Sequence, residues 1–415
     1  MCSGPELLSV NDSADPATDS LLHQLNTSST KPLARTVLAL NSGSSSLKYG
    51  VYHVDENGPQ MLLAGNIETL PQAMTDLTAG LESALARVRR EISEAGLAVP
   101  DTIGHRVVHG GPTLRQHCVI DAGVITALEA ASGFAPLHTP TTVAAIRLAA
   151  QQFPNRPQVA CFDTCFHVGL PDVARVFPIP RKLQRAGIER YGFHGLSCES
   201  TVQQLGATLP ARLVIAHLGN GSSVTAVRAG RSVDTTMGLT PTGGIPMGTR
   251  SGDLDPGVLL YLMREHHYTA AQLAELVDHR AGLLGLSGLS SDMRQLHAAA
   301  PGNAEARLAI EMFCYSVRKS LAAMTAVLEG VDMMVFTGGI GENDSQIRAA
   351  ICNGLMWLGV ALDEQRNRQG RDTISTAASP CIVRVLPALE SDRIAHHSWM
   401  LTSTSVASSA KQGQT

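Results

Sequence analysis

VLALNSGSSSLKY (residues 37–49) recurs in altered form as VIAHLGNGSSVTAV (residues 214–227). In each copy an apolar run leads into a turn of Gly, Ser and Asn and then into an alternating run, which predicts strand, tight turn, strand. Glycine lets the backbone approach an anion closely, and serine hydroxyls and N–H groups can donate to phosphate oxygens. Because a strand is expected after Lys48, the strand-to-helix Walker A loop is disfavoured. The repeat predicts a phosphate-holding hairpin in each half of the chain.

Composition narrows the class of protein. The 415 residues allow two or three domains, and the two hairpins favour two. The net charge of −4, without a long run of Lys or Arg, disfavours a nucleic-acid partner. The eight cysteines include no C-x-x-C pair, so they suggest neither a zinc ribbon nor a disulfide framework and suit a reducing cytoplasm. No apolar stretch approaches the ~20 residues that span a bilayer, so we expect no membrane partner.

From Thr36 onward apolar strands alternate with amphipathic helices, which is typical of an α/β fold. An apolar strand ending at Asp163 marks the expected boundary between two domains. TGGIGEN (residues 337–343) follows another strand and precedes a helix expected to open near Asp344, so its backbone N–H groups would face an anion. Residues 1–35 contain no signal-peptide core and are interpreted as a disordered extension, or as upstream sequence from a misplaced start codon.

Five further motifs accompany the hairpins: GHRVVHGG (104–111), FDT (162–164), YGFHG (191–195), MGTRSGD (247–253) and GIGEN (339–343). With them the chain closely resembles the acetate kinase family from about Val37 to Ser398. The resemblance implies the duplicated, ribonuclease H-like fold shared with actin, sugar kinases and Hsp70-type ATPases, with a nucleotide cleft between two related domains. It also implies a homodimer that uses Mg²⁺, or Mn²⁺, with ATP/ADP and acetate or acetyl phosphate as substrates.

On this resemblance each part of the chain has an expected place. The first actin-like domain would comprise residues 36–162 and a C-terminal helix at about 391–402. The second, with the nucleotide site, would comprise residues 163–390. Residues 403–415, rich in Ser and Thr, are expected to be a flexible tail.

The residues themselves favour phosphoryl transfer to a carboxylate. A carboxylate is already ionised at pH 7 and needs no general base, so the obstacle is its approach to the anionic γ-phosphate. Fixed positive charge should dominate catalysis, and the guanidinium groups of Arg106 and Arg250 match carboxylate and phosphate oxygens. The alternatives are that each arginine forms a structural salt bridge and that His194 is a structural histidine.

The resemblance implies a role for each matching residue. The expected catalytic residues are Arg106, Asp163, His194, Asn220 and Arg250. The acid would be bound by Arg106 and by an apolar pocket of Val108, Leu137, Phe193 and Pro241, which could also be plain core residues. Asn41 and Glu390 would lie on the metal side, and His138 near the active site. The nucleotide would contact Lys48, His217, Asn220, Gly221, Asp292, Arg294, Gly339, Ile340, Gly341 and Asn343, and Arg348 is either a further contact or an exposed helix residue.

The chain departs from the family pattern at several loops. LHTPTT (residues 137–142) stands where the family usually has LHNPPN, ALES (388–391) replaces TNEE, and Leu196-Ser197-Cys198 replaces Thr-Ser-His. We expect reversible, direct in-line transfer of the ATP γ-phosphoryl group to acetate. Because an apolar pocket distinguishes one methylene by only about 1–3 kcal/mol, a propionate or short-chain acyl kinase is the alternative. An actin-like ATPase acting on a protein partner is the alternative of another class.

Overall fold

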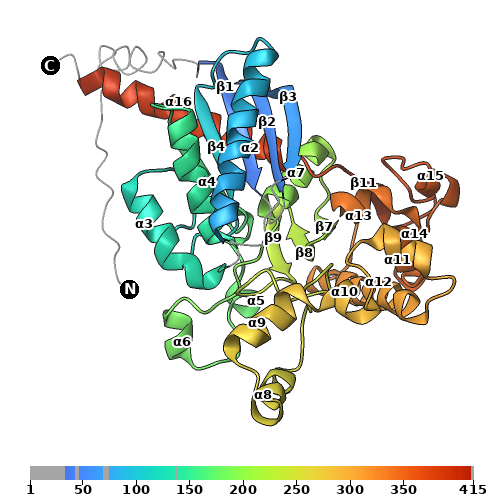
Figure 1. The fold of residues 1–415 in the computed structure, drawn as a ribbon. Coiled ribbons are helices and arrows are strands. Elements are labelled where there is room, and N and C mark those ends of the chain that lie inside the picture. The colour runs from blue at the N-terminus through green and yellow to red at the C-terminus, as the bar shows by residue number, and fades with distance from the viewer. Residues whose placement is uncertain (1–32, 43–45, 69–73, 137, 413–415) are drawn as a thin grey trace, which may run out of the picture.

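The computed structural model describes residues 33–42, 46–68, 74–136 and 138–412. They form two mixed sheets with helices on their faces, which confirms the predicted α/β fold (Figure 1). The first sheet contains β1 (Arg35–Ser42), β2 (Ser46–Asp55), β3 (Gly58–Glu68), β4 (Thr102–Val107), β5 (Cys118–Val119) and β6 (Gln158–Phe162). The second contains β7 (Arg212–Leu218), β8 (Ser222–Arg228), β9 (Arg231–Thr235), β10 (Met333–Thr337) and β11 (Ile382–Val385). Most of the expected N-terminal extension, and Leu137, lie outside the described residues.

One strand topology occurs in both sheets. β1, β2 and β3 form an antiparallel meander, and β1 pairs in parallel with β4, which pairs in parallel with β6. β7, β8 and β9 repeat the meander, and β10 and β11 repeat the parallel pairs. The order β3-β2-β1-β4-β6 therefore has its counterpart in β9-β8-β7-β10-β11. The duplication predicted from the two hairpins, β1–β2 and β7–β8, extends to five strands in each half.

Helices cover both faces of the first sheet. They are α2 (Met74–Glu94), α3 (Ala122–Ala130) and α4 (Thr139–Gln152), with α16 (Glu390–Gln412) returning from the end of the chain. Leu81 and Leu85 of α2 are buried against strand residues such as Leu38, as their helical spacing predicts. On the opposite face Ile394 and Trp399 of α16 are buried. The last helix thus belongs to the first sheet.

Two helices, one in each half of the chain, differ from the sequence-based expectation. α16 was expected to end at about residue 402, before a flexible tail, but it continues as a helix to Gln412. In the second half α13 (Gly338–Asn343) begins directly after β10, before the helix expected near Asp344. Gly338 makes this possible, because its φ is +78° and a Cβ there would lie 2.8 Å from the Leu218 carbonyl oxygen.

The second sheet is packed mainly against α12 (Ala304–Val327), whose Phe313, Val317 and Leu321 are buried in the larger core. The remaining helices of this half are α8 (Pro256–Glu265), α9 (Ala270–His279), α10 (Gly282–Ser287), α11 (Met293–Ala299), α14 (Ser345–Asn353) and α15 (Glu364–Arg368). The segment that joins the two sheets contains α5 (Asp172–Arg175), α6 (Arg181–Arg185) and α7 (Gly195–Leu205). Among the described residues, none of the helices has the length and apolar character needed to cross a membrane.

α7 joins the two halves. Its Leu196 lies in the core beneath α16, whereas its Cys198 lies in a core of the second sheet. Glu199 accepts a hydrogen bond from His397 Nε2 of α16 at 2.8 Å, and Arg393 of α16 lies 3.7 Å from the same carboxylate. Because α7 packs against both halves, the domain boundary at residues 162 and 163 stays a prediction.

Candidate active site

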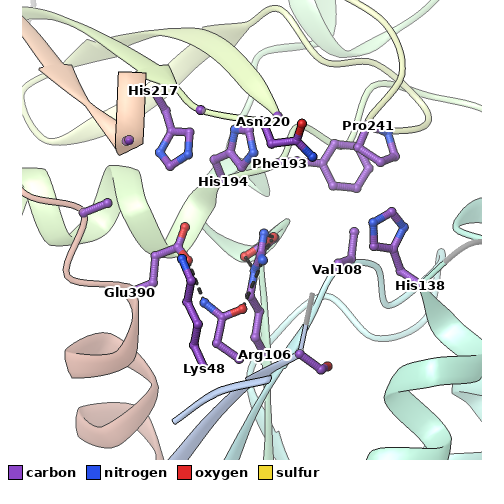
Figure 2. A pocket seen from close by; sticks show the side chains of 18 of the residues that line it. Lys48, Arg106, Val108, His138, Phe193, His194, His217, Asn220, Pro241 and Glu390 are labelled. Carbon is purple, nitrogen blue, oxygen red and sulfur yellow. Dashed lines mark hydrogen bonds and ion pairs between the residues drawn. The ribbon is translucent and has the colours of Figure 1, made fainter. Parts of the chain in front are cut away.

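A cavity of about 570 Å³ is lined by residues of both hairpins. His194, which directly precedes α7, and Glu390, the first residue of α16, also line it. Figure 2 shows His217, His194 and Asn220 facing Glu390 and Arg106 across this space. The predicted residues at this cavity are Asn41, Lys48, Arg106, Val108, His138, Asp163, Phe193, His194, His217, Asn220, Gly221, Pro241, Arg250, Gly339 and Glu390.

A second cavity of about 590 Å³ continues the first along α11 and α13. The two share Gly219, Asn220 and Gly339. The predicted nucleotide residues that line the second are Asp292, Arg294, Ile340 and Asn343, besides the shared ones. The two cavities thus adjoin at the glycine-rich turns, an arrangement that suits a ligand whose phosphates lie beside these turns.

Arg348 takes neither of the places predicted for it. Its side chain is buried, and its guanidinium donates to the carbonyl oxygens of Gly341 (2.8 Å), Glu342 (2.9 Å) and Asn367 (2.9 Å) and to Asn367 Oδ1 (2.8 Å). Arg348 therefore stabilises the end of α13 through its carbonyl groups. It is not exposed, and it lines neither of the two cavities. Gly341, whose carbonyl accepts one of these bonds, is buried and lines neither of the two cavities.

A chain of polar contacts crosses the floor of the first cavity. Arg106 donates to both carboxylate oxygens of Asp163, with Nη2 to Oδ2 at 2.5 Å and Nε to Oδ1 at 3.1 Å. Its Nη1 donates to Asn41 Oδ1 at 3.2 Å, and Asn41 Nδ2 donates to Glu390 Oε2 at 2.9 Å. The alternative of a structural salt bridge thus holds for Arg106, whose guanidinium also faces the cavity.

The charges of this chain are strongly coupled. Burial lowers the pKa of Arg106, but the Asp163 and Glu390 carboxylates outweigh it and raise that pKa. Burial, with the Glu390 charge, raises the pKa of Asp163 against the opposing effect of Arg106. For Glu390 the cost of burial is outweighed by Arg106, His217 and Asn41, so its pKa is lowered. Glu390 is therefore held ionised at neutral pH and can attract a cation.

Arg250, unlike Arg106, forms no ion pair with a carboxylate among the described residues. Its Nη1 donates to the Pro241 carbonyl oxygen at 3.2 Å and approaches Met247 Sδ at 3.8 Å. In the described ranges no carboxylate oxygen lies within 4 Å of its guanidinium, and burial lowers its pKa, with Asp278 opposing. Even a partly buried charge without a counter-ion is costly, so this site favours an anionic ligand.

His194 faces the same point of the cavity as Arg250. A Cβ on Gly221 would lie 3.2 Å from His194 Nε2 and 3.4 Å from Arg250 Nη1, so glycine keeps the space between them open. The His194 backbone is left-handed (φ 57°, ψ 27°), a conformation that costs about 1–3 kcal/mol in a non-glycine residue and is typical of functional sites. The next residue must be small, because a Cβ on Gly195 would lie 2.2 Å from the Asp163 carbonyl oxygen.

The apolar end of the cavity is formed by Val108, Phe193 and Pro241 beside the His138 imidazole, as Figure 2 shows. Burial and the nearby Arg250 and Arg106 charges lower the pKa of His138 to about 3, so the ring is neutral. A neutral ring beside three apolar side chains accommodates a short alkyl group. The predicted fourth member, Leu137, lies outside the described residues.

The chain is similar to known proteins in both sequence and fold. The acetokinase family matches residues 36–396. The chain belongs to the acetokinase family. It is 40% identical to the acetate kinase of Thermosynechococcus vestitus over 90% of this chain and 100% of that protein. Its fold resembles a propionate kinase from Francisella tularensis (TM-score 0.77, 34% identity, 88% of this chain and 99% of that one) and the acetate kinase of Porphyromonas gingivalis (TM-score 0.75, 32% identity, 88% and 99%).

Some residues of this acetokinase site were missed by the sequence analysis. Glu342 lines the cavity, and its Oε1 accepts hydrogen bonds from the backbone N–H groups of Gly338 (2.9 Å) and Ala388 (3.0 Å). It thereby joins the turn after β10 to the loop that carries Glu390. Glu342 stands in the quoted GIGEN motif, so a carboxylate among glycines was the available signal. Nothing in the sequence indicated that Glu342 would accept a hydrogen bond from Ala388, 46 residues away.

Proposed function

We propose that this chain catalyses the reversible, magnesium-dependent transfer of the γ-phosphoryl group of ATP to acetate, which gives acetyl phosphate and ADP. The observation that supports this most is Arg250, a partly buried guanidinium that lies between an apolar pocket and the two hairpins and forms no ion pair with a carboxylate of the described residues. An acid with a short alkyl group satisfies both parts of that environment. Its carboxylate meets the guanidinium, and its methyl group meets Val108, Phe193 and Pro241.

In the proposed reaction a carboxylate oxygen of acetate forms a bond to the γ-phosphorus while the bond to the bridging oxygen of ADP breaks. Acetate is ionised at neutral pH, so no proton has to be removed. Arg250 and Arg106 reduce the repulsion between the two anions. His194 and Asn220 donate to the oxygens of the phosphoryl group in flight. Phosphoryl transfer depends chiefly on such positioning and electrostatic stabilisation.

The residues on the metal side suit a hydrated Mg²⁺. Glu390 is ionised, and Asn41 holds only one of its oxygens, whereas both oxygens of Asp163 are bonded to Arg106. We therefore assign Glu390 as the group that faces the ion, through water, and Asn41 and Asp163 as residues that hold their charged neighbours. When bound, the ion neutralises charge on the β- and γ-phosphates. Mn²⁺, which also prefers oxygen ligands, is the expected substitute.

The nucleotide is proposed to lie along the two cavities. Lys48, His217 and Gly221 face its phosphates, and the exposed Asp292–Arg294 pair (2.6 Å), with Ile340 and Asn343, borders the nucleoside. In contrast to Arg250, Arg294 is fully exposed, so its effect should be smaller.

Propionate is the second candidate acceptor, because a structural relative at 34% identity is a propionate kinase. An apolar pocket of this kind gives only about 1–3 kcal/mol of discrimination per methylene. We expect acetate to be preferred and propionate to be a slower substrate.

We also propose a cytoplasmic homodimer. Exposed apolar side chains occur on α8 (Val258, Leu260 and Tyr261) and on α12 (Leu308, Met312 and Tyr315), and such surfaces are suited to a second copy. The proposed location rests on the cysteine pattern of the sequence, which contains no C-x-x-C pair and favours a reducing compartment. Sedimentation of the purified chain at micromolar concentration should give twice the monomer mass, and a monomer would contradict this part of the proposal.

A hydroxylamine trap tests the activity. Protein, MgATP, acetate and hydroxylamine should yield acetyl hydroxamate, and kcat/KM across formate, acetate, propionate and butyrate should peak at acetate. A peak at butyrate would contradict the pocket assignment. ATP hydrolysis that no acid affects would contradict the proposed function itself.

A further inference from the structure

Two serines hold the two stacked histidines of the cavity. Ser223 Oγ lies 2.9 Å from Nδ1 of His194, and Ser197 Oγ lies 2.8 Å from Nδ1 of His217. The imidazole rings are stacked, with centroids 4.1 Å apart and planes inclined by 25°. Both serines are buried, at 1% and 0% exposure. In both rings the serine occupies the same nitrogen, and Nε2 is the nitrogen left for a ligand.

Other buried histidines nearby show which way such a hydrogen bond runs. His167 Nε2 lies 2.9 Å from the Phe193 carbonyl oxygen, which can only accept, so the ring proton is on Nε2. Its Nδ1 must then accept from the hydroxyl of Ser232, 2.8 Å away. This is the same serine-to-histidine contact, with its direction determined by a backbone carbonyl.

Backbone groups impose the same tautomer on two more rings. The Gly111 N–H donates to Nδ1 of His109, whose Nε2 faces the Leu239 carbonyl oxygen at 3.2 Å. The Phe162 N–H donates to Nδ1 of His117 at 3.0 Å. A neutral imidazole has one proton, so both rings carry it on Nε2. The His117 ring, which lies beside Glu199 and His397, is therefore poorly suited to bind a cation through Nε2.

In His167 and His109 a backbone carbonyl oxygen faces Nε2, whereas in His194 and His217 the group that faces Nε2 would be the bound ligand. The oxygens of an anionic phosphoryl group can only accept, so a histidine that faces them contributes only if Nε2 carries the proton. Burial lowers the pKa of His194 well below its ordinary value and that of His217 to about 4, so each ring has a single proton at neutral pH. Its position on Nδ1 or Nε2 decides whether the ring attracts or repels the phosphate.

We propose that Ser223 and Ser197 are positioning residues that donate to Nδ1 of His194 and His217 and so hold both rings as Nε2–H donors to phosphate oxygens. Without the hydroxyl, Nδ1 would be buried without a donor, and the Nδ1–H tautomer would gain population. The ring would then present a lone pair to the phosphoryl group. The kinetic part of this inference rests on the proposed function, whereas the tautomers themselves do not.

Nuclear magnetic resonance of the full-length protein with ¹⁵N-labelled histidine rings tests the tautomers directly. With magnesium and a non-hydrolysable ATP analogue bound, His194 and His217 should both show a protonated Nε2 and an unprotonated Nδ1. In S223A, the His194 signal should shift toward the Nδ1–H form. A His194 that is protonated on Nδ1 in the wild-type complex would overturn the proposal, whether or not the enzyme makes acetyl phosphate.

Kinetics give the second readout. S223A should lower kcat at least about 10-fold, up to the 10²–10³-fold loss seen when a transition-state donor is removed, with the KM values for both substrates changed less than about threefold. S197A should chiefly raise KM for MgATP, because His217 is assigned to the nucleotide. S223T, which keeps a hydroxyl, should recover most of the activity, and recovery equal to S223A would contradict the assignment.

S232A is the matched control. It removes the same type of buried serine-to-histidine hydrogen bond, but the Phe193 carbonyl still fixes the His167 tautomer. Its kcat should stay within about threefold of wild type even if its melting temperature falls. An equal loss of kcat in S232A and S223A would show that the effect is one of packing and would overturn the proposal.

Discussion

Removal of Arg106 should destabilise the fold much more than removal of Arg250, because Arg106 is paired with the Asp163 carboxylate and Arg250 has no such partner among the described residues. In R250A no carboxylate of the described residues loses a counter-ion within 4 Å, and the bonds lost are those to the Pro241 carbonyl and Met247 sulfur. We therefore expect the free energy of unfolding to change by less than about 1 kcal/mol. In R106A the Asp163 carboxylate, 1% exposed, loses a bidentate partner. Breaking one side of a buried pair costs about 3–5 kcal/mol.

In contrast to their stabilities, the activities of R250A and R106A should fall to a similar extent. Both variants lose positive charge that faces the acceptor and the phosphoryl group, so kcat should fall at least about 100-fold in each, which corresponds to about 2.7 kcal/mol. Acetyl hydroxamate formation by the folded fraction and urea unfolding measure the two quantities on the same samples. R384A, which breaks the Arg384–Asp372 ion pair outside both cavities, is the control for a lost arginine. If R250A destabilises as much as R106A, or keeps near-wild-type kcat, the assignment of Arg250 as the ligand-facing cation is wrong.

Further predictions follow from single contacts. E342A should raise KM for MgATP at least about fivefold, because Gly338 and Ala388 lose their common acceptor; an unchanged KM in steady-state assays would contradict that role. R348M should lower the urea midpoint strongly while the folded fraction keeps its kcat, since Arg348 is buried and bonded to backbone; a selective loss of kcat would argue against this. V108A should raise the propionate-to-acetate ratio of kcat/KM by up to about 10-fold, and an unchanged ratio would remove Val108 from the pocket. Burial lowers the pKa of His105 to about 4, so the unfolded chain binds the extra proton first, and stability should fall between pH 6.5 and 4 by about 1.4 kcal/mol per pH unit for this residue. In H105Q the loss over that range should be smaller by up to about 3 kcal/mol, and equal slopes for both proteins would refute the linkage.

The sequence predicted the parts of the fold that depend on local pattern. In each hairpin an apolar run is followed, a few residues later, by an alternating run, so the strand pairing of β1 with β2 and of β7 with β8 is local. The stripe containing Leu81 and Leu85 has the spacing of a helix that buries one face. The resemblance to the acetate kinase family, carried by motifs in the same order, implied that Arg106, His194 and Arg250 share one cavity, and all three line it.

What could not be predicted depends on contacts between distant residues. Arg106 and Asp163 are 57 positions apart, and only parallel pairing of β4 with β6 makes them meet. Arg348 lies on a helix of ordinary composition, and its inward course follows from carbonyl groups left free at the end of α13. The serine hydroxyls of the second hairpin were expected to donate to phosphate oxygens, and the contact of Ser223 with His194 appears only in the folded chain.

The most direct test of the account is ³¹P nuclear magnetic resonance of the wild-type protein with MgATP and acetate, beside the same mixture with R250A. We expect the wild type to convert ATP to ADP and acetyl phosphate in equal amounts and to run the reaction backward from acetyl phosphate and MgADP. R250A should do neither at a comparable rate. Release of inorganic phosphate as the main product, at a rate independent of acetate, would contradict it.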